Sequence, residues 1–143
     1  MAEQKYESHI ESITAPVSHV YAVLSNLQNL ERVRDLIPQD KVQEMEISTD
    51  CVRIKVDGLG QKITLRIVES VENDTIKFGI DNLPMQMNFW IQMKSVAPSD
   101  TRIKLTLKAD IPIMFRMMLD KKIQQGINDA AVMLSQFPYS QWQ

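Results

Sequence analysis

Cysteine is nearly absent from this chain of 143 residues, and basic residues are not in excess. The single cysteine, Cys51, excludes an internal disulfide and a cysteine-based metal cluster. A net charge of −2 argues against a nucleic-acid partner, which needs a basic patch. No apolar run approaches the ~20 residues that span a bilayer, and residues 1–6 lack the apolar core of a secretion signal. We therefore expect a cytoplasmic protein without a membrane span.

The motifs of common catalytic and cofactor sites are also missing. The two histidines, His9 and His19, are not spaced as a metal-ligand pair, and the four glycines form no dinucleotide-binding or phosphate-binding loop. No two carboxylates share an apolar stripe, so there is no obvious pair for acid–base catalysis. From these patterns we predict no metal, no cofactor and no catalytic residue.

The length and composition fit one globular domain covering residues 1–143. Hydrophobic residues make up 44% of the chain and charged residues 24%, which are ordinary proportions for a domain that buries a core. Methionine is abundant, with nine residues against four phenylalanines. Because methionine is flexible and fills irregular space, this excess fits either an adaptable binding surface or an ordinary core.

The segment 112–137 carries the pattern of a long amphipathic helix. Its charged and amide side chains lie opposite an apolar stripe formed by Ile123, Ile127, Ala130, Ala131 and Leu134. A helix of this length would extend roughly 35–40 Å at about 1.5 Å per residue. It is therefore long enough to cover a large sheet.

The rest of the chain is predicted to form strands and two short helices. Residues 6–13 suit a first strand, and Pro16 then begins a helix that is followed by a second short helix from Leu27 to Leu36. Between residues 41 and 110, apolar and polar residues alternate in six segments, as in antiparallel strands with one packed face. The pattern predicts an α+β fold in which a curved sheet of seven antiparallel strands wraps around the long C-terminal helix.

The connections differ in composition between the two ends of this sheet. In an up-and-down meander, alternate connections lie at the same end. The three polar turns at residues 48–50, 72–74 and 98–100 are therefore predicted to share one end of the sheet. The other end holds two apolar-tipped loops and the start of the long helix. If a cavity opens there, its apolar rim consists of Leu59, Leu83, Ile113, Met114 and Met117. The alternative is that these residues cap the core.

The order of these elements resembles the helix-grip fold of the START-like (SRPBCC) superfamily, which includes polyketide cyclases, lipid-transfer START domains and the birch-pollen-allergen family. The chain is most similar to a bacterial single-domain branch without an assigned function. Short motifs along nearly the whole chain carry the resemblance, namely Ile13-Thr14-Ala15-Pro16, Val20-Tyr21, Leu24-Ser25-Asn26, Asn29-Leu30-Glu31, Ile67-Val68-Glu69, Phe89-Trp90-Ile91-Gln92 and Thr106-Leu107-Lys108-Ala109-Asp110.

This resemblance implies a cavity between the sheet and the long helix, but it implies no activity, because fold does not determine function. Arg116 and Asp120, one helical turn apart, would orient a ligand; the alternative is a solvated pair beyond the sheet edge. We expect the ligand-binding residues to be Leu65, Phe78, Phe89, Ile91, Met93, Leu105, Arg116, Met117, Asp120 and Ile123.

Three functions remain open from the sequence. The first is binding or carriage of a small apolar or amphipathic molecule, such as a lipid. The second is a cyclase-type or hydrolase-type enzyme in the same cavity, in which Arg116, Asp120 and either Tyr6 or Tyr21 orient the substrate. The third is an interaction module with a filled core, which forms a homodimer or binds a partner protein.

Overall fold

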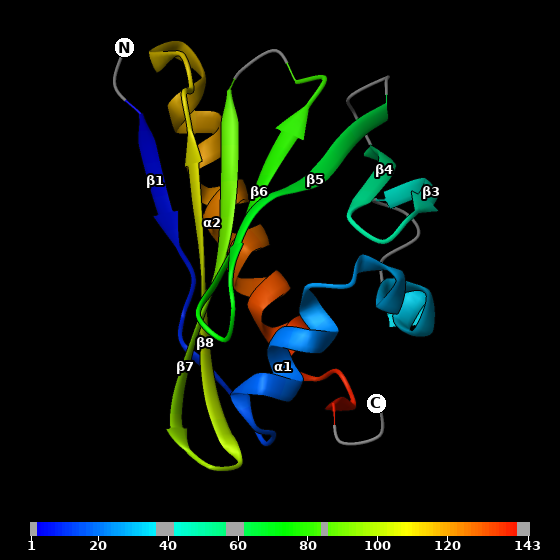
Figure 1. Ribbon diagram of the computed structural model, residues 1–143. Helices are drawn as coiled ribbons and strands as arrows, with labels where there is room; N and C mark the ends of the chain where they lie inside the picture. Colours follow the sequence, from blue (N-terminus) through cyan, green and yellow to red (C-terminus); the bar gives the residue numbers. More distant parts are fainter. Residues whose placement is uncertain (1–2, 37–41, 57–61, 84–85, 140–143) are drawn as a thin grey trace.

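The computed structural model of this chain describes residues 3–36, 42–56, 62–83 and 86–139. One antiparallel sheet curves around a long C-terminal helix, and two short helices lie between the second and third strands (Figure 1). None of the described helices has the length and apolar character needed to cross a membrane.

The sheet has the strand order β1-β8-β7-β6-β5-β4-β3, and β2 pairs separately with β8. Its strands are β1 (Gln4–Glu7), β2 (Glu11–Ile13), β3 (Val42–Ile47), β4 (Cys51–Val56), β5 (Lys62–Val71), β6 (Thr75–Asp81), β7 (Met87–Ala97) and β8 (Asp100–Ala109). The helices are α1 (Val17–Leu24), the 3-10 helix η1 (Leu27–Leu36) and α2 (Ile113–Ser135). The predicted α+β fold is confirmed, including the two short helices and the long last one.

The first predicted strand differs from expectation, because it is divided into β1 and β2. Glu7 pairs with Thr106 and Glu11 with Ile103, so four steps along this strand face three steps along β8. At the break, Ser8 Oγ accepts a hydrogen bond of 2.9 Å from the backbone N–H of Leu105. A side chain thus replaces a backbone acceptor in the ladder, and the extra residue bends the strand as a β-bulge does. The sheet therefore has eight strands instead of seven.

The long helix covers only one part of the sheet. It contacts β1, β2 and β8, and its buried side chains are Ile127, Ala131 and Leu134. Ala131 is fully buried, and its small side chain lets the helix backbone approach the sheet closely. The apolar faces of β4, β5 and β6 lie to the side of this contact (Figure 1), on the side of the sheet where η1 packs against β3.

A second, smaller core fills the end of the sheet where α2 begins. The buried residues Tyr6, Ala109 and Ile111 pack there with four half-buried side chains, those of Met87, Leu107, Leu119 and Ile123. The backbone N–H of Asp110 donates to the carbonyl of Gln86 at 3.1 Å, which joins the entry into α2 to the start of β7. Gln86, which follows the predicted loop 81–84, therefore lies beside the predicted entry into the long helix, 110–113.

A buried hydrogen bond joins the first helix to the sheet. Thr101 is fully buried on β8, and its Oγ1 donates to the carbonyl of Ala15 at 2.8 Å. We expect Thr101→Val to lower the free energy of unfolding by about 1–3 kcal/mol, because the carbonyl of Ala15 loses its partner in the core. Urea denaturation measures the change. Thr64→Val, at a half-buried position on β5, is the matched control and should change stability by less than about 0.5 kcal/mol. Equal effects of the two variants would contradict the assignment.

Candidate functional site

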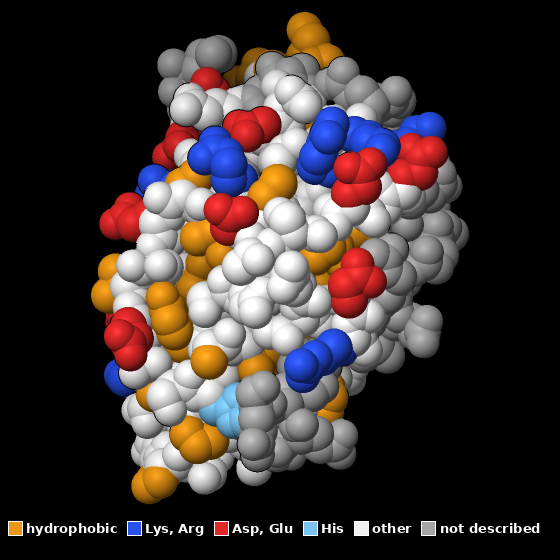
Figure 2. All heavy atoms as spheres, turned by 45° about the vertical axis from the view of Figure 1, so that its right-hand side comes forward, with side chains coloured by type: hydrophobic (Ala, Val, Ile, Leu, Met, Phe, Trp, Pro, Cys, Tyr) orange, Lys and Arg blue, Asp and Glu red, His pale blue; other side chains and the backbone are white. Residues whose placement is uncertain are grey.

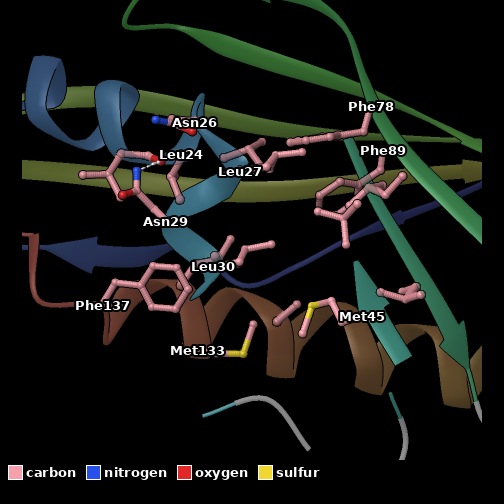
Figure 3. Close-up of a pocket in the computed structure, with 17 residues that line it drawn as sticks. Leu24, Asn26, Leu27, Asn29, Leu30, Met45, Phe78, Phe89, Met133 and Phe137 are labelled. Atoms are coloured by element: carbon pink, nitrogen blue, oxygen red, sulfur yellow. Dashed lines mark hydrogen bonds between the residues drawn. The ribbon is translucent and has the colours of Figure 1, made fainter. Parts of the chain in front are cut away.

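An apolar cavity of ≈220 Å³ lies between the sheet, the two short helices and the second half of α2 (Figure 3). It is lined by Val23, Leu24, Asn26, Leu27, Asn29, Leu30, Met45, Val52, Ile54, Leu65, Phe78, Phe89, Ile91, Ala130, Met133, Leu134 and Phe137. These residues come from α1, η1, five consecutive strands and the C-terminal helix with its extension. The cavity therefore exists only in the folded chain.

The strands provide the floor of the cavity through their alternating apolar residues. Phe78 on β6 and Phe89 on β7 are paired across the two strands, and their ring centroids are 5.6 Å apart at an interplanar angle of 44°. In Figure 3 both rings lie along one wall, opposite Met133 and Phe137. Tilted aromatic pairs of this kind make a stiff apolar surface.

The C-terminal helix and the segment after it form the opposite wall. Ala130 faces the cavity with a single methyl group, and this small side chain leaves space that a larger residue would fill. Phe137 is 5% exposed and packs against Tyr139, with ring centroids 6.0 Å apart. The Tyr139 hydroxyl donates to the carbonyl of Leu134 at 2.7 Å. This bond returns the aromatic tail to the helix and holds Phe137 at the cavity.

The short 3-10 helix closes the side of the cavity. The backbone N–H of Leu27 donates to the carbonyl of Thr49 at 2.9 Å, which attaches the start of η1 to the β3–β4 turn. Asn29 Nδ2 donates to the carbonyl of Val23 at 2.9 Å, and Asn26 Oδ1 accepts from the N–H of Gln28 at 3.1 Å. One polar side-chain atom of each asparagine thus bonds to the local backbone.

The lining carries no charge. Apart from Asn26 and Asn29, every side chain among the 17 lining residues described is apolar, and none of them titrates. A ligand in this cavity therefore meets hydrocarbon, sulfur and aromatic rings, and finds no ionic partner among these side chains.

Four of the residues predicted to bind ligand, Leu65, Phe78, Phe89 and Ile91, line the cavity. Met93 and Leu105 do not: they are buried in the same core, with 5% and 0% exposure, at positions outside the cavity wall.

Arg116, Asp120 and Ile123 lie in a different place, at the second core near the start of α2. The Tyr6 hydroxyl donates a hydrogen bond to Asp120 Oδ1, and Arg116 Nε donates to the carbonyl of Ile111 at 3.3 Å. Burial, followed by the hydrogen bond and the charge of Asp120, raises the pKa of Tyr6 to about 12, and the charge of Arg116 partly opposes this rise. Ile123 packs against the same small core. These groups stabilise the junction of β1 and α2, away from the cavity.

The expected rim residues also lie away from the cavity. Ile113, Met114 and Met117 are 78%, 76% and 94% exposed, and Leu83 is half-buried without lining the cavity. Leu59 lies outside the described residues. Met114 and Met117 lie in the first turns of α2, more than two turns before its buried residues Ile127, Ala131 and Leu134. The second core occupies the space at the end of the sheet where a mouth was expected.

Most of the remaining lining residues were not predicted. The apolar stripes of the two short helices and of α2 do contain Leu24, Leu27, Ala130 and Leu134, so this signal was present in the sequence. It did not show which stripe faces which strand.

A second hollow, of ≈630 Å³, lies on the outer side of α1 and η1. Its lining includes Ser18, His19, Ala22 and Arg32, and five of its eight lining residues described are polar; three of the four named residues are exposed. Despite its larger volume, its wall includes charged and polar side chains and offers less continuous apolar surface. The apolar cavity is therefore the better candidate for ligand binding.

Several solved structures share this fold at low sequence identity. Norcoclaurine synthase from Thalictrum flavum, in complex with dopamine and hydroxybenzaldehyde, is similar with a TM-score of 0.76 and 12% identity over 99% of this chain and 90% of that chain. The Zhui aromatase/cyclase from a Streptomyces species is similar with a TM-score of 0.64 and 18% identity over 93% and 92% of the two chains. The di-domain ARO/CYC BexL has a TM-score of 0.68 and 16% identity, over 94% of this chain and 45% of that chain.

The sequence itself matches no protein-family model and no curated protein. At the identities of the structural matches, the likeness establishes the fold alone. It confirms the fold that the sequence resemblance implied.

The hydrogen bond between Tyr6 and Asp120 can be tested by titration. We expect Asp120→Asn to lower the pKa of Tyr6 from about 12 toward the ordinary value of 10.0, because the hydrogen bond to a carboxylate and its negative charge are both lost while burial remains. The ring carbon resonances of labelled tyrosine report the midpoint. Asp129→Asn, whose carboxylate accepts from Gln125 on the same helix, is the control. An unchanged midpoint in Asp120→Asn would exclude the bond.

Proposed function

We propose, from the premise that this chain has the helix-grip fold of the START-like (SRPBCC) superfamily, that it binds a small uncharged apolar molecule in the cavity between the sheet, η1 and α2. The observation that carries this proposal is the continuous apolar lining around ≈220 Å³ of space. A domain that packs its interior to the usual density leaves few voids larger than a water molecule. Space of this size with an apolar wall is typical of a binding site.

The volume limits the size of the ligand. Pockets for drug-sized ligands usually have roughly 300–1,000 Å³, and an engineered apolar cavity of about 150 Å³ holds benzene. The cavity of ≈220 Å³ lies between these values. We therefore expect a ligand of one to three rings, or a short branched chain, and not a full-length diacyl lipid.

The wall chemistry limits the charge of the ligand. Burying an ionised group away from water is strongly unfavourable unless a partner compensates it. The lining side chains described supply no such partner, since the two asparagine amides already bond to the backbone. A neutral molecule, with at most a hydroxyl or carbonyl near Asn26 and Asn29, fits this environment.

One structural neighbour supports a ligand of this size. Norcoclaurine synthase, which shares the fold, is known in a complex with dopamine and hydroxybenzaldehyde, two single-ring aromatic molecules. The floor of the present cavity is itself aromatic, with Phe78 and Phe89 in contact. An aromatic ring of the ligand would pack edge-to-face or offset against them.

Binding is favoured over turnover by the position of the polar groups. Tyr6, Arg116 and Asp120, which an enzyme in this cavity was expected to use, lie at the second core instead of the cavity. A general acid or base must come within hydrogen-bond reach of the reacting atom. The third possibility, an interaction module with a filled core, is disfavoured by the cavity itself.

A larger side chain in the cavity should weaken probe binding without loss of stability. We expect Ala130→Leu to weaken the binding of the uncharged fluorescent probe N-phenylnaphthylamine by at least about tenfold, which corresponds to about 1.4 kcal/mol. The same variant should unfold at an equal or higher temperature, because filling an apolar cavity commonly stabilises a protein by about 0.5–2 kcal/mol. Fluorescence titration and thermal unfolding measure the two effects.

The control for this variant is Val132→Leu on the same helix. Val132 is 40% exposed and does not line the cavity, so its substitution should leave probe affinity unchanged. Equal loss of affinity in the two variants, or none in Ala130→Leu, would place the probe elsewhere and reject the proposed site.

The charge of the ligand can be tested with a pair of molecules of equal length. We expect octanol to displace the probe at a concentration at least about tenfold lower than octanoate at neutral pH, because the carboxylate loses its hydration without gaining a cationic partner. Competition fluorescence gives both values. If octanoate competes equally well, the carboxylate is reaching a charged group, and an uncharged ligand class is wrong.

A further inference from the structure

The beginning of α2 exposes an unusual number of large apolar side chains. Over its first six residues, hereafter the α2 tip (Ile113–Met118), five are exposed and apolar: Ile113 78%, Met114 76%, Phe115 42%, Met117 94% and Met118 61%. The other exposed large apolar residues in the described chain lie outside this segment: Ile10, Val68, Val71, Val96 and Val132. Hydrophobic side chains are visible at the upper edge of the molecule in Figure 2, the end at which α2 begins. Contiguous apolar surface of this kind marks a site of interaction.

Positive charge follows directly on the same helix. Lys121 and Lys122 are exposed one turn after the α2 tip, and neither belongs to an ion pair within the described part of the chain. The acidic residue of this segment, Asp120, is turned inward, where it accepts the hydrogen bond from Tyr6. Several basic residues elsewhere belong to ion pairs, for example Lys62 with Glu46 at 2.7 Å.

Among residues 113–122 of α2, the exposed side chains thus combine apolar and cationic groups, and the one carboxylate, Asp120, is bonded to Tyr6. An apolar helix face with adjacent lysines is the pattern that binds at the interface of a lipid bilayer. The apolar side chains enter the boundary between headgroups and acyl chains, and the lysines attract anionic headgroups.

We propose that the α2 tip docks reversibly on an anionic membrane surface, with Met114 and Met117 inserted below the headgroups and Lys121 and Lys122 at the level of the phosphates. The inference goes beyond the proposed cavity function and does not depend on it, because the cavity is lined by the second half of α2. The docking surface is on the outer side of the first half.

A second copy of the chain fits this surface less well. A standard protein interface uses about 20–30 residues on each side, and the α2 tip offers five exposed apolar residues. In a symmetric dimer the same patch packs against itself, which would bring Lys121 and Lys122 of both copies close together. Like charges that are brought together in an interface oppose association. A lipid surface with negative charge accommodates both features.

The test is sedimentation of the protein with two kinds of vesicle, one of phosphatidylcholine alone and one of phosphatidylcholine and phosphatidylglycerol in equal parts. We expect binding to the mixed vesicles and much less to the neutral ones, with loss in high salt. Met117→Asp should weaken binding by at least about tenfold, because it puts an anion among anionic headgroups. Changing Lys121 and Lys122 together to Gln should weaken it by roughly fivefold per lysine.

The control is Val96→Asp, which changes an apolar side chain that is 48% exposed near the β7–β8 turn, at the other end of the sheet. It should bind the mixed vesicles as the parent protein does. Met117 is almost fully exposed, so its substitution should leave the circular dichroism spectrum and the binding of N-phenylnaphthylamine unchanged. The lysine variant provides a second test that leaves the apolar residues intact.

Three outcomes would overturn the proposal. The first is equal sedimentation with both kinds of vesicle, which would remove the role of charge. The second is unchanged binding by Met117→Asp. The third is a dimer in light scattering that Met117→Asp dissociates, which would assign the α2 tip to self-association. None of these outcomes bears on the cavity, whose occupancy is measured with the probe.

Discussion

The contact between the second half of α2 and one edge of the sheet is the constraint on which the structure depends. Ala131 is fully buried there, beside Ile127 and Leu134, and the helix contacts β1, β2 and β8. A helix about 10 Å wide cannot also cover the apolar faces of β4, β5 and β6. These faces are left to η1, whose start is attached to the β3–β4 turn through Leu27 and Thr49. The cavity is the space that remains between α2, η1 and the sheet.

The interior of the molecule is polar at one end and apolar toward the other. At one end, the second core places the hydroxyl of Tyr6 against the carboxylate of Asp120 and raises the pKa of the tyrosine. This bond turns the only carboxylate of the first turns of α2 inward. Toward the other end, the cavity is lined almost wholly by hydrocarbon and aromatic groups. Polar interactions therefore organise the junction of β1 with α2, and shape and apolar burial define the ligand site.

One helix carries both proposed activities on different parts of its surface. Its inner face in the second half provides Ala130, Met133 and Leu134 to the cavity, while its outer face at the start presents methionines and lysines to the exterior. The two sets are separated along the helix axis by about eight residues, roughly 12 Å at about 1.5 Å per residue, so they do not interfere. Methionine suits both places, because its flexible side chain adapts to irregular apolar surroundings.

The sequence by itself determined the fold class, the bounds of the helices to within a few residues and the apolar face of each strand, because these depend on local periodicity. It also identified Leu65, Phe78, Phe89 and Ile91 as inward-facing residues. Only the tertiary structure decided that the cavity lies beside η1, that Arg116 and Asp120 belong to another cluster, and that Met117 points outward. These features depend on which stripe of a helix meets which strand and on the break at Ser8. Such choices are made by packing between segments far apart in the chain, which no local pattern contains.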